Sequence, residues 1–328
     1  MHNGFDAIQA IRKRPGMYVG GVGQFGVYHL VQELVSNSLD QFLAGRVKTI
    51  SVSCNDECIS VSDDGDGLPS NGGEADFTDW FMHFRDQPSA TGHAPHVHLE
   101  PVGLGLIVLN ALSSHLEVES IREGKQCRAV FSRGDLLHFE TKPLEGERSG
   151  TFVRFVPDPG IFETSLPDLS FLRQKLFDAV HLVPGVRIHF NGESFYSEAG
   201  LIDLAQIFCG SETPFPRFNA RINADDISVD VVAMGSRFGG TEQSIFSWAN
   251  GSRTEEGGSH VKGFLAAIES SNKSGWTPST LLINVTMQQP EFAGPSRGRL
   301  YVPGIESRIQ ELIQPEFEEF ITSLPGIY

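Results

Sequence analysis

The segment Val27–Leu43 constrains the fold most, because it has the pattern of a long amphipathic helix with a polar stripe beside its apolar one. Its apolar residues recur at the three- and four-residue spacings of an α-helix, and Gly45 follows as a C-terminal stop. Glu33, Asn37 and Asp40 stand at i, i+4 and i+7 and share a second face. Such a helix must bury its apolar stripe against another layer while its polar stripe lies at one edge.

Two strand patterns follow this helix and lead into a glycine-rich turn. Thr49–Cys54 and Cys58–Asp63 alternate apolar and polar residues around a short polar segment, which predicts a hairpin. Because side chains on a strand alternate between its two faces, Ile59, Val61 and Asp63 share one face of the second strand. The Asp63 carboxylate therefore ends an apolar face. The turn after it contains Gly65 and Gly67.

The sequence suggests a phosphate-hydrolysing site formed by Glu33, Asn37, Asp63 and the turn that contains Gly65 and Gly67. Such a site needs a carboxylate that polarises water, an oxygen ligand for magnesium and a glycine-rich backbone near the nucleotide. Spacing alone leaves the alternative open that they form a solvated helix face and a surface turn. A calcium-binding EF-hand is excluded because its first and twelfth positions would be Ser62 and Gly73. The GxxxxGK[ST] phosphate loop is absent from the chain.

Composition and length predict two domains of class α+β. The chain has 328 residues and is 40% hydrophobic, which suffices for two packed cores. A Gly/Pro/Ser/Thr-rich segment around Gly210–Phe218 is expected to link residues 1–212 to residues 213–328. The second half alternates strand and helix patterns, which favours an α+β fold.

The charge balance limits the partners that the chain can bind. A formal net charge of −16 argues against a main role in gripping DNA, because counterion release needs a basic face. No apolar run approaches the roughly 20 residues of a membrane helix, and no signal sequence is evident at the N-terminus. A cytoplasmic location and no membrane partner are therefore expected.

A series of motifs recurs in order over nearly the whole chain: IRKRPGMYVG (11–20), HLVQELVSNSLDQFLAG (29–45), SVSDDGDGLP (60–69), VGLGLIVLNALS (102–113), REGK (122–125), GTFVRFVPDP (150–159) and EEGGSHVKGF (255–264). With these motifs the chain resembles the ATPase half of the gyrase B and topoisomerase IV E subunits. The presence of both RKRPGMY and GG[ST]HxxGF separates it from the chaperone, histidine-kinase and mismatch-repair relatives.

The resemblance implies a GHKL (Bergerat) ATP-binding α/β sandwich, followed by a smaller transducer domain with a ribosomal-protein-like βαβ fold. It implies ATP and Mg²⁺ as ligands. By matching positions, Glu33 corresponds to the general base that orients the attacking water, and Asn37 to the magnesium ligand. Asp63 corresponds to the acid that accepts the adenine amino group.

Further positions match the nucleotide pocket of the family. The resemblance implies that Gly65 and Gly67 let the base approach, that Thr151 supports an adenine-bound water and that Arg122 lies at the pocket mouth. In the lid, whose amides hold phosphates at a helix N-terminus, the matching glycines are Gly103 and Gly105. The transducer loop Gln-Thr-Lys of the family corresponds to Pro295-Ser296-Arg297, so Arg297 is the expected catalytic cation.

Two departures from the family pattern stand beside these matches. The lid run reads Glu100-Pro101-Val102 before Gly103, which puts an acid near the phosphates. The arginine of the family's DDGRGIP motif is Asp66 and the acid that it pairs with is Gln41, so that ion pair is lost. The loss of this ion pair argues against the binding of aminocoumarin-type gyrase inhibitors.

The extent of the chain suggests which partners it needs. RKRPGMY begins at Arg12, which leaves a short N-terminal arm and implies weak homodimerisation on ATP binding. The TOPRIM and DNA-contacting parts do not follow before Tyr328, so a gyrase A-like or TOPRIM-bearing partner chain is implied, with DNA contacted only indirectly. The hypothesis is a slow ATPase module of a type II topoisomerase. The rival hypothesis is a stand-alone, catalytically weak relative that acts as a nucleotide-dependent binding or regulatory module.

Overall fold

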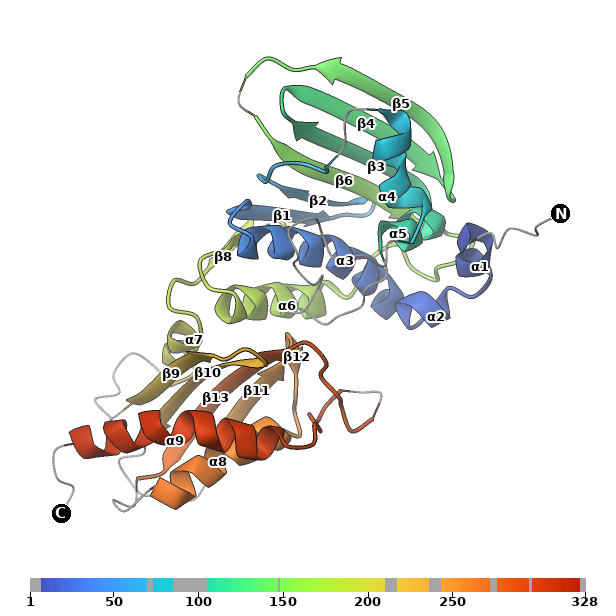
Figure 1. Ribbon diagram of the computed structural model, residues 1–328. Coiled ribbons are helices and arrows are strands. Elements are labelled where there is room, and N and C mark those ends of the chain that lie inside the picture. The colour runs from blue at the N-terminus through green and yellow to red at the C-terminus, as the bar shows by residue number, and fades with distance from the viewer. Residues whose placement is uncertain are drawn as a thin grey trace. The chain divides into compact units, whose positions relative to one another are not determined.

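The chain folds into two units, each built on its own β-sheet (Figure 1). The computed structural model describes residues 7–69, 73–84, 105–146, 148–209, 217–235, 243–271, 276–294 and 297–324. The first unit comprises the described residues up to Val180 together with Gly185–Tyr196. The second comprises His181–Pro184 and the described residues from Ser197 onward. The domain boundary expected between residues 212 and 213 lies outside the described ranges and stays a prediction.

The first unit contains an eight-stranded mixed sheet with the order β5-β4-β3-β6-β2-β1-β7-β8. Strands β1 and β7 are parallel, and the other neighbouring strands are antiparallel. Buried apolar side chains alternate with more exposed ones along the central strands, so one face of the sheet carries the core. The strands are β1 (Thr49–Cys54), β2 (Ile59–Asp63), β3 (Ser113–Arg122), β4 (Lys125–Ser132), β5 (Asp135–Pro143), β6 (Gly150–Pro157), β7 (Arg187–Phe190) and β8 (Glu193–Tyr196).

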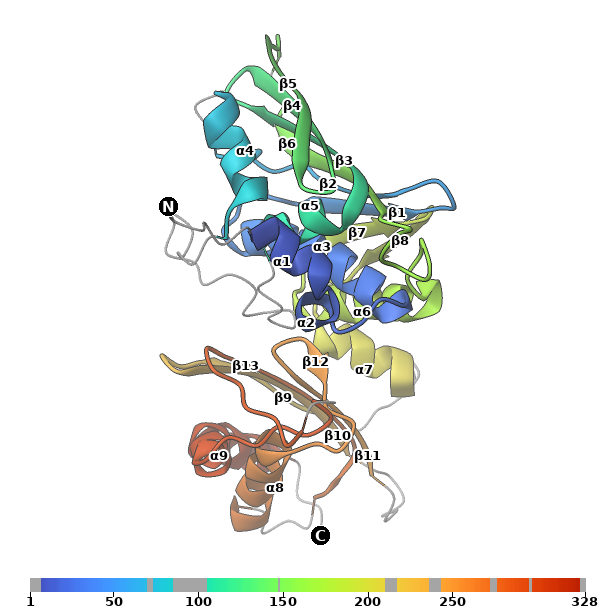
Figure 2. The same ribbon diagram turned by 90° about the vertical axis from the view of Figure 1, so that its right-hand side faces the viewer.

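Helices cover this core face (Figure 2). The longest of them, α3, contacts β2 and α5 and buries its apolar stripe, as its periodicity predicts. The helices of the first unit are α1 (Ala7–Lys13), α2 (Gly16–Val19), α3 (Gln24–Leu43), α4 (Glu74–Met82), α5 (Leu106–Leu112) and α6 (Leu169–Leu182). In the described part of the chain, no helix combines the length and the apolar character that crossing a bilayer requires.

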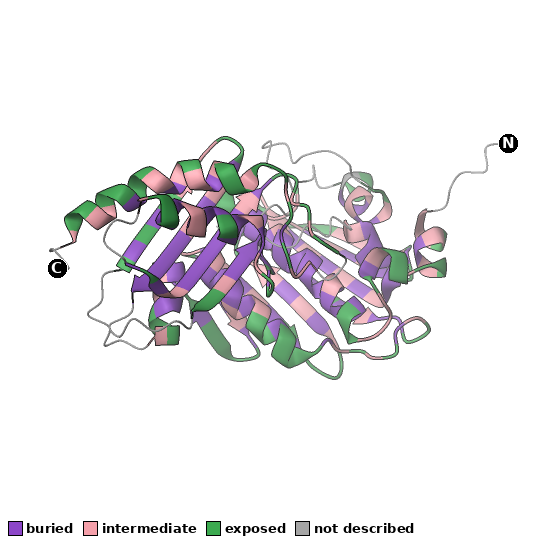
Figure 3. Cartoon of the chain, turned by 90° about the horizontal axis from the view of Figure 1, so that it is seen from below, coloured by how far each residue is buried: buried purple, intermediate pink, exposed green. Residues whose placement is uncertain are grey.

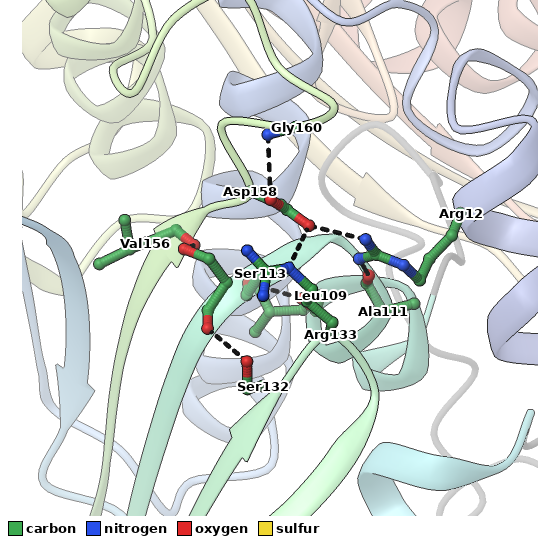
Figure 4. Close-up of polar contacts among 10 residues, drawn as sticks. Arg12, Leu109, Ala111, Ser113, Ser132, Arg133, Val156, Asp158 and Gly160 are labelled. Atoms are coloured by element: carbon green, nitrogen blue, oxygen red, sulfur yellow. Dashed lines mark hydrogen bonds and ion pairs between the residues drawn. The ribbon is translucent and has the colours of Figure 1, made fainter.

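A buried carboxylate ties the N-terminal helix to the sheet (Figure 4). Asp158 follows β6, is 1% exposed, and accepts hydrogen bonds on Oδ2 from Arg12 Nη2 at 2.7 Å and Arg133 Nε at 3.0 Å. Arg12 Nη1 also donates to the Ala111 carbonyl near the end of α5 at 2.7 Å, and the Gly160 amide donates to Asp158 Oδ1 at 3.0 Å. Burial would raise the pKa of Asp158, but these hydrogen bonds lower it below its ordinary value. The RKRPGMY and FVPDP motifs therefore meet in one ion-pair cluster.

The second unit contains a five-stranded sheet with the order β12-β11-β13-β10-β9. Strands β11 and β13 are parallel, and α8 connects them as a βαβ crossover. Helices α8 and α9 cover one face with a core that includes Phe264 and Phe317, and α7 contacts β10 and β13 on the other face (Figure 2). The central strands β10 and β13 are buried along most of their length, whereas edge strand β9 is mostly exposed (Figure 3). The elements are α7 (Leu201–Cys209), β9 (Arg217–Asn223), β10 (Ile227–Gly235), β11 (Ser244–Ala249), β12 (Ser252–Arg253), α8 (Ser259–Ser271), β13 (Pro278–Met287) and α9 (Ile305–Ser323).

The α+β class and the mixed sheet under helices agree with the prediction, but several elements do not follow from the sequence pattern. Edge strand β5 has no two-residue burial alternation, because most of its side chains are partly or fully exposed. Helix α7 buries Leu201, Leu204 and Ala205 at helical spacing, but the apolar Ile207 and Phe208 are exposed beside that stripe. Strand β9 begins at Arg217, inside the segment that was expected to be a linker.

Candidate functional site

Helix α3 carries the polar stripe that the sequence singles out. Glu33 is 3% exposed, Asp40 is buried and Asn37 is half-buried. A solvated helix face would leave these side chains in water, so the burial of two of these three side chains argues against that alternative. An acid is rarely buried to this degree without a partner or a role.

Asp63 ends β2 on the core side of the sheet and is held by groups from three directions. Ser38 Oγ, on α3, donates to Asp63 Oδ2 at 2.8 Å, and the Gly65 amide donates to Oδ1 at 3.0 Å. The backbone of Thr151, the β6 residue paired with Asp63, also lowers the pKa of the carboxyl group. Burial nevertheless raises the pKa of Asp63 above its ordinary value, with a further increase from the neighbouring Asp64 carboxylate.

The turn after Asp63 requires its two glycines. A Cβ on Gly65 would lie 2.7 Å from Val47 Cγ2 and 3.0 Å from Asp63 Oδ1. Gly67 has φ of +77°, and a Cβ there would lie 2.5 Å from the Ile121 carbonyl oxygen. The turn therefore approaches both the acid and strand β3 more closely than any side chain would allow.

Polar groups from the neighbouring strands fix this turn in place. Ser120 Oγ accepts a hydrogen bond from the Leu68 amide at 2.8 Å. Asp64 Oδ1 accepts hydrogen bonds from the Lys48 and Thr49 amides at 2.8 and 2.9 Å. The loop beside Asp63 is thus held by a side chain from β3 and by the backbone at the start of β1.

Arg122 and Thr151 come from the two strands β3 and β6 beside the turn. Thr151 pairs with Asp63 on one side and Ser120 on the other in the strand register. Arg122, at the end of β3, is within 3.5 Å of the Gly67 carbonyl through Nη1 and contacts Glu123 through Nε at 3.2 Å. Both residues therefore border the glycine turn.

A second arginine borders the same turn. Arg46 Nε lies 3.7 Å from Asp66 Oδ2, and its Nη1 donates to Gln41 Oε1 at 3.4 Å. The family ion pair between positions 66 and 41 is absent, as the sequence indicates, but a cation from position 46 lies between them. The negative charge of Asp66 is therefore compensated by Arg46.

The structure leaves some predicted residues apart from this cluster. Gly105 is the N-cap of α5 with φ of +69°, and α5 contacts α3. Gly103 and the Glu100-Pro101-Val102 run lie outside the described residues, as do Pro295 and Ser296.

Arg297 belongs to the second unit, where its guanidinium carbon lies 5.6 Å from the centroid of the Phe292 ring. Its loop is held by hydrogen bonds from the Glu256 amide to the Gly298 carbonyl and from the Leu300 amide to the Gly257 carbonyl. The GGSH motif therefore supports the loop that carries Arg297.

The described residues contain no group of three or more His, Cys, Asp or Glu side chains arranged to hold a metal. This arrangement does not conflict with Mg²⁺, which usually keeps several waters and takes one or two protein oxygens together with substrate phosphates. The half-buried Asn37 offers such an oxygen on the same helix as Glu33. The residues present fit a magnesium ion that arrives with a nucleotide.

Sequence reasoning missed Ser38, Ser120 and Arg46. Ser120 carried a signal, because it continues the inward-facing positions of Leu116 and Val118 and is itself buried. Ser38 and Arg46 carried none, because their contacts depend on how α3 and the following turn meet β2.

Comparison with known proteins assigns the region that contains this cluster. The family model described as "Histidine kinase-, DNA gyrase B-, and HSP90-like ATPase" matches residues 23–159. The chain is 29% identical to the B subunit of DNA topoisomerase 4 from Mycoplasma genitalium over 96% of the chain and 55% of that protein. It is 31% identical to the B subunit of DNA gyrase from Archaeoglobus fulgidus over 94% of the chain and 53% of that protein. The chain thus spans about half the length of these relatives.

Solved structures extend the likeness to both units. The 43K ATPase domain of Thermus thermophilus gyrase B, in complex with an aminocoumarin, superposes with a TM-score of 0.78 at 25% identity, covering 97% of this chain and 90% of that one. The B subunit of DNA gyrase from Myxococcus xanthus gives a TM-score of 0.75 at 24% identity, covering 97% of this chain and 96% of that one.

Proposed function

We propose that the chain binds Mg-ATP and hydrolyses it with Glu33 as general base. Two findings support this: residues 23–159 match the family model for histidine kinase-, DNA gyrase B- and HSP90-like ATPases, and the chain has the fold of the gyrase B ATPase region. The observation that carries this proposal is the link between α3 and Asp63. Ser38 joins the helix that bears Glu33 and Asn37 directly to the carboxylate that would receive adenine. The helix that carries the proposed general base is thus linked directly to the carboxylate that would accept the adenine amino group.

The nucleotide would bind with its adenine amino group donating to Asp63. In this proposal Gly65 and Gly67 would let the adenine approach. In the structure they let the turn pack closely against Asp63 and β3, and Thr151 borders the same acid. Arg122 would contribute positive charge at the pocket mouth, with Gly103 and Gly105 offering backbone amides to the phosphates. This assignment joins the observed cluster to the positions that match the family.

Hydrolysis would begin when a water held by Glu33 attacks the γ-phosphorus. The water proton passes to the Glu33 carboxylate while the bond from the γ-phosphorus to the β–γ bridging oxygen breaks, which releases ADP and phosphate. A magnesium ion on Asn37 would supply charge neutralisation at the phosphates when bound. Arg297 would add a cation against the charge that develops on the γ-phosphoryl group.

We place this activity in a type II topoisomerase. The support is that the matched relatives are subunits of DNA gyrase and topoisomerase 4 and that the chain covers about half of each. In this proposal the chain dimerises weakly on ATP binding, works with a gyrase A-like or TOPRIM-bearing partner, and contacts DNA only indirectly. The cytoplasmic location that the sequence predicts belongs to the same proposal.

One observation favours a second function, a nucleotide-dependent binding module with little turnover. The Arg297 guanidinium lies over the Phe292 ring of its own loop, a contact that holds the proposed catalytic cation locally. ATP would then change the conformation of the chain without being hydrolysed efficiently.

Phosphate release and ATP calorimetry on the full chain test the proposal. Glu33→Ala should reduce turnover by about 10²- to 10⁴-fold while ATP affinity is retained, because the base positions water rather than the nucleotide. Glu33→Gln, which keeps the side-chain volume, serves as the control for packing and should be equally slow. Unchanged turnover in both variants would remove Glu33 from the mechanism.

Adding a gyrase A-type chain and DNA to the same assay separates the two functions. Stimulated turnover in the wild-type chain, lost in Glu33→Ala, supports the topoisomerase module. Tight ATP binding without turnover in any mixture supports the binding module.

A further inference from the structure

Ser38 occupies a position that neither the family match nor the polar stripe explains. It follows Asn37 on α3, is 4% exposed, and donates to Asp63 Oδ2 at 2.8 Å. This contact spans 25 residues in sequence and is a hydrogen bond between a helix side chain and the acid at the end of β2. The hydroxyl therefore acts on the group that would read the base of a nucleotide.

The donors around Asp63 occupy part of its capacity to accept hydrogen bonds and leave a position for a ligand. An ionised carboxylate offers about four acceptor positions on its two oxygens. Ser38 and the Gly65 amide use two of them, so there is room for a further donor. The amino group of adenine is such a donor, whereas the C6 carbonyl of hypoxanthine is an acceptor.

We propose that Ser38 is a specificity-determining residue that keeps Asp63 an acceptor and so favours a purine with an amino group over one with a carbonyl. The inference rests on the proposed ATP site and adds to it the residue that sets the preference for the base. An acid that carries its own proton would instead donate and would pair with a carbonyl.

The surroundings of Asp63 explain why it needs this hydroxyl. Burial raises the pKa of Asp63, and the neighbouring Asp64 carboxylate raises it further. Hydrogen bonds from Ser38, Gly65 and Thr151 oppose that rise, and the Ser38 bond is the largest of the three opposing contributions. Asp64 is itself held by the Lys48 and Thr49 amides, so it cannot turn away to relieve the repulsion.

Losing the hydroxyl has a consequence with a definite sign. With Ser38→Ala, the pKa of Asp63 rises further, so the acceptor form needed for adenine is lost at a higher pH. ATP affinity should therefore begin to fall at a higher pH in the variant than in the wild type, as the pH is lowered. A role limited to packing would not move that pH profile.

The test is calorimetric titration of the full chain with ATP and with inosine triphosphate, from about pH 8 down to about pH 5. Ser38→Ala should lose up to about 10-fold in ATP affinity at the acid end of this range, because a hydrogen bond to a charged group shifts the ionisation equilibrium of Asp63 by about that factor. Its affinity for inosine triphosphate should change less, and its pH profile should shift upward. Ser38→Thr keeps a hydroxyl and should restore both the preference and the profile.

Ser36→Ala is the matched control. Ser36 lies two residues earlier on α3, is 2% exposed, and its Oγ has no hydrogen-bond partner among the described residues. This variant should keep the wild-type preference and profile. Equal losses of ATP and inosine triphosphate in Ser38→Ala, with an unchanged pH profile, would overturn the proposal. A folded wild-type chain that binds neither nucleotide would overturn the ATP site itself. That outcome is distinguishable from failure of the Ser38 proposal, because it is seen without any substitution.

Discussion

Replacing Asp158 with asparagine should destabilise the first unit while leaving every proposed nucleotide-binding residue in place. The carboxylate is 1% exposed and accepts hydrogen bonds from the Arg12 and Arg133 side chains and from the Gly160 amide. An asparagine has the same shape, but it has no charge and would turn an amide toward two guanidinium groups or lose the Gly160 contact. The variant therefore separates the charge of the cluster from its packing.

The magnitude follows from how exposed each partner is. The Arg133 side chain is 54% exposed, so its pair contributes about 0–1 kcal/mol. The Arg12 bond lies in a more buried setting, where a hydrogen bond to a charged group contributes about 1.5–3 kcal/mol. The sum is a loss of about 1.5–4 kcal/mol. Each kcal/mol lowers the melting temperature by about 2–4 °C in a domain of this size.

The pH dependence of the effect has a fixed direction. Because the pKa of Asp158 is lowered on folding, its contribution is present above the ordinary aspartate pKa of about 3.9 and is lost as the pH falls through the folded value. Urea denaturation of the full chain at neutral and acidic pH measures this. Asp56→Asn, at an exposed turn position, is the control. A difference below about 0.5 kcal/mol at neutral pH, or one that grows in acid, would refute the reasoning.

Two further predictions concern the second unit. Arg297→Ala should cut ATP turnover far more than ATP affinity, because a cation against developing phosphoryl charge acts mainly in the transition state. Equal rates for Arg297→Ala, Arg299→Ala and wild type would show that Arg297 is no more than a loop residue. Burial lowers the pKa of His260 to about 3, so the unfolding free energy of this unit should fall as the pH drops below about 6.5, where the unfolded histidine binds a proton. His260→Leu should flatten that slope in denaturation experiments, and an unchanged slope would assign it to other groups.

The fold could be predicted where local periodicity and burial agree. Helix α3 begins three residues before the predicted start at Val27 and ends at Leu43, as predicted. The hairpin of β1 and β2 also follows from its alternation, including the inward place of Asp63. Edge strand β5 could not be predicted, because the exposure of its side chains removes the alternation. Helix α7 was missed although Leu201, Leu204 and Ala205 have helical spacing, because the exposed apolar Ile207 and Phe208 blur its polar face.

The candidate site also contains residues that a local pattern predicts and residues that depend on tertiary contacts. Glu33 and Asn37 follow from helical spacing, and the glycine turn follows from its composition. Ser38 lies beside them, yet its role depends on the approach of α3 to β2, which no local pattern encodes. Arg46 is a comparable case, since its contact with Asp66 joins two turns that are 20 residues apart in sequence (66 − 46 = 20).

The central claim is that this chain binds ATP through Asp63, and calorimetry of the wild type and Asp63→Asn tests it most directly. The asparagine would turn a donor toward the adenine amino group or toward Ser38, and a mispaired buried polar group costs about 1–3 kcal/mol. We predict a folded variant whose ATP affinity is lower by roughly 5- to 150-fold. A folded Asp63→Asn chain with wild-type ATP affinity would contradict the account.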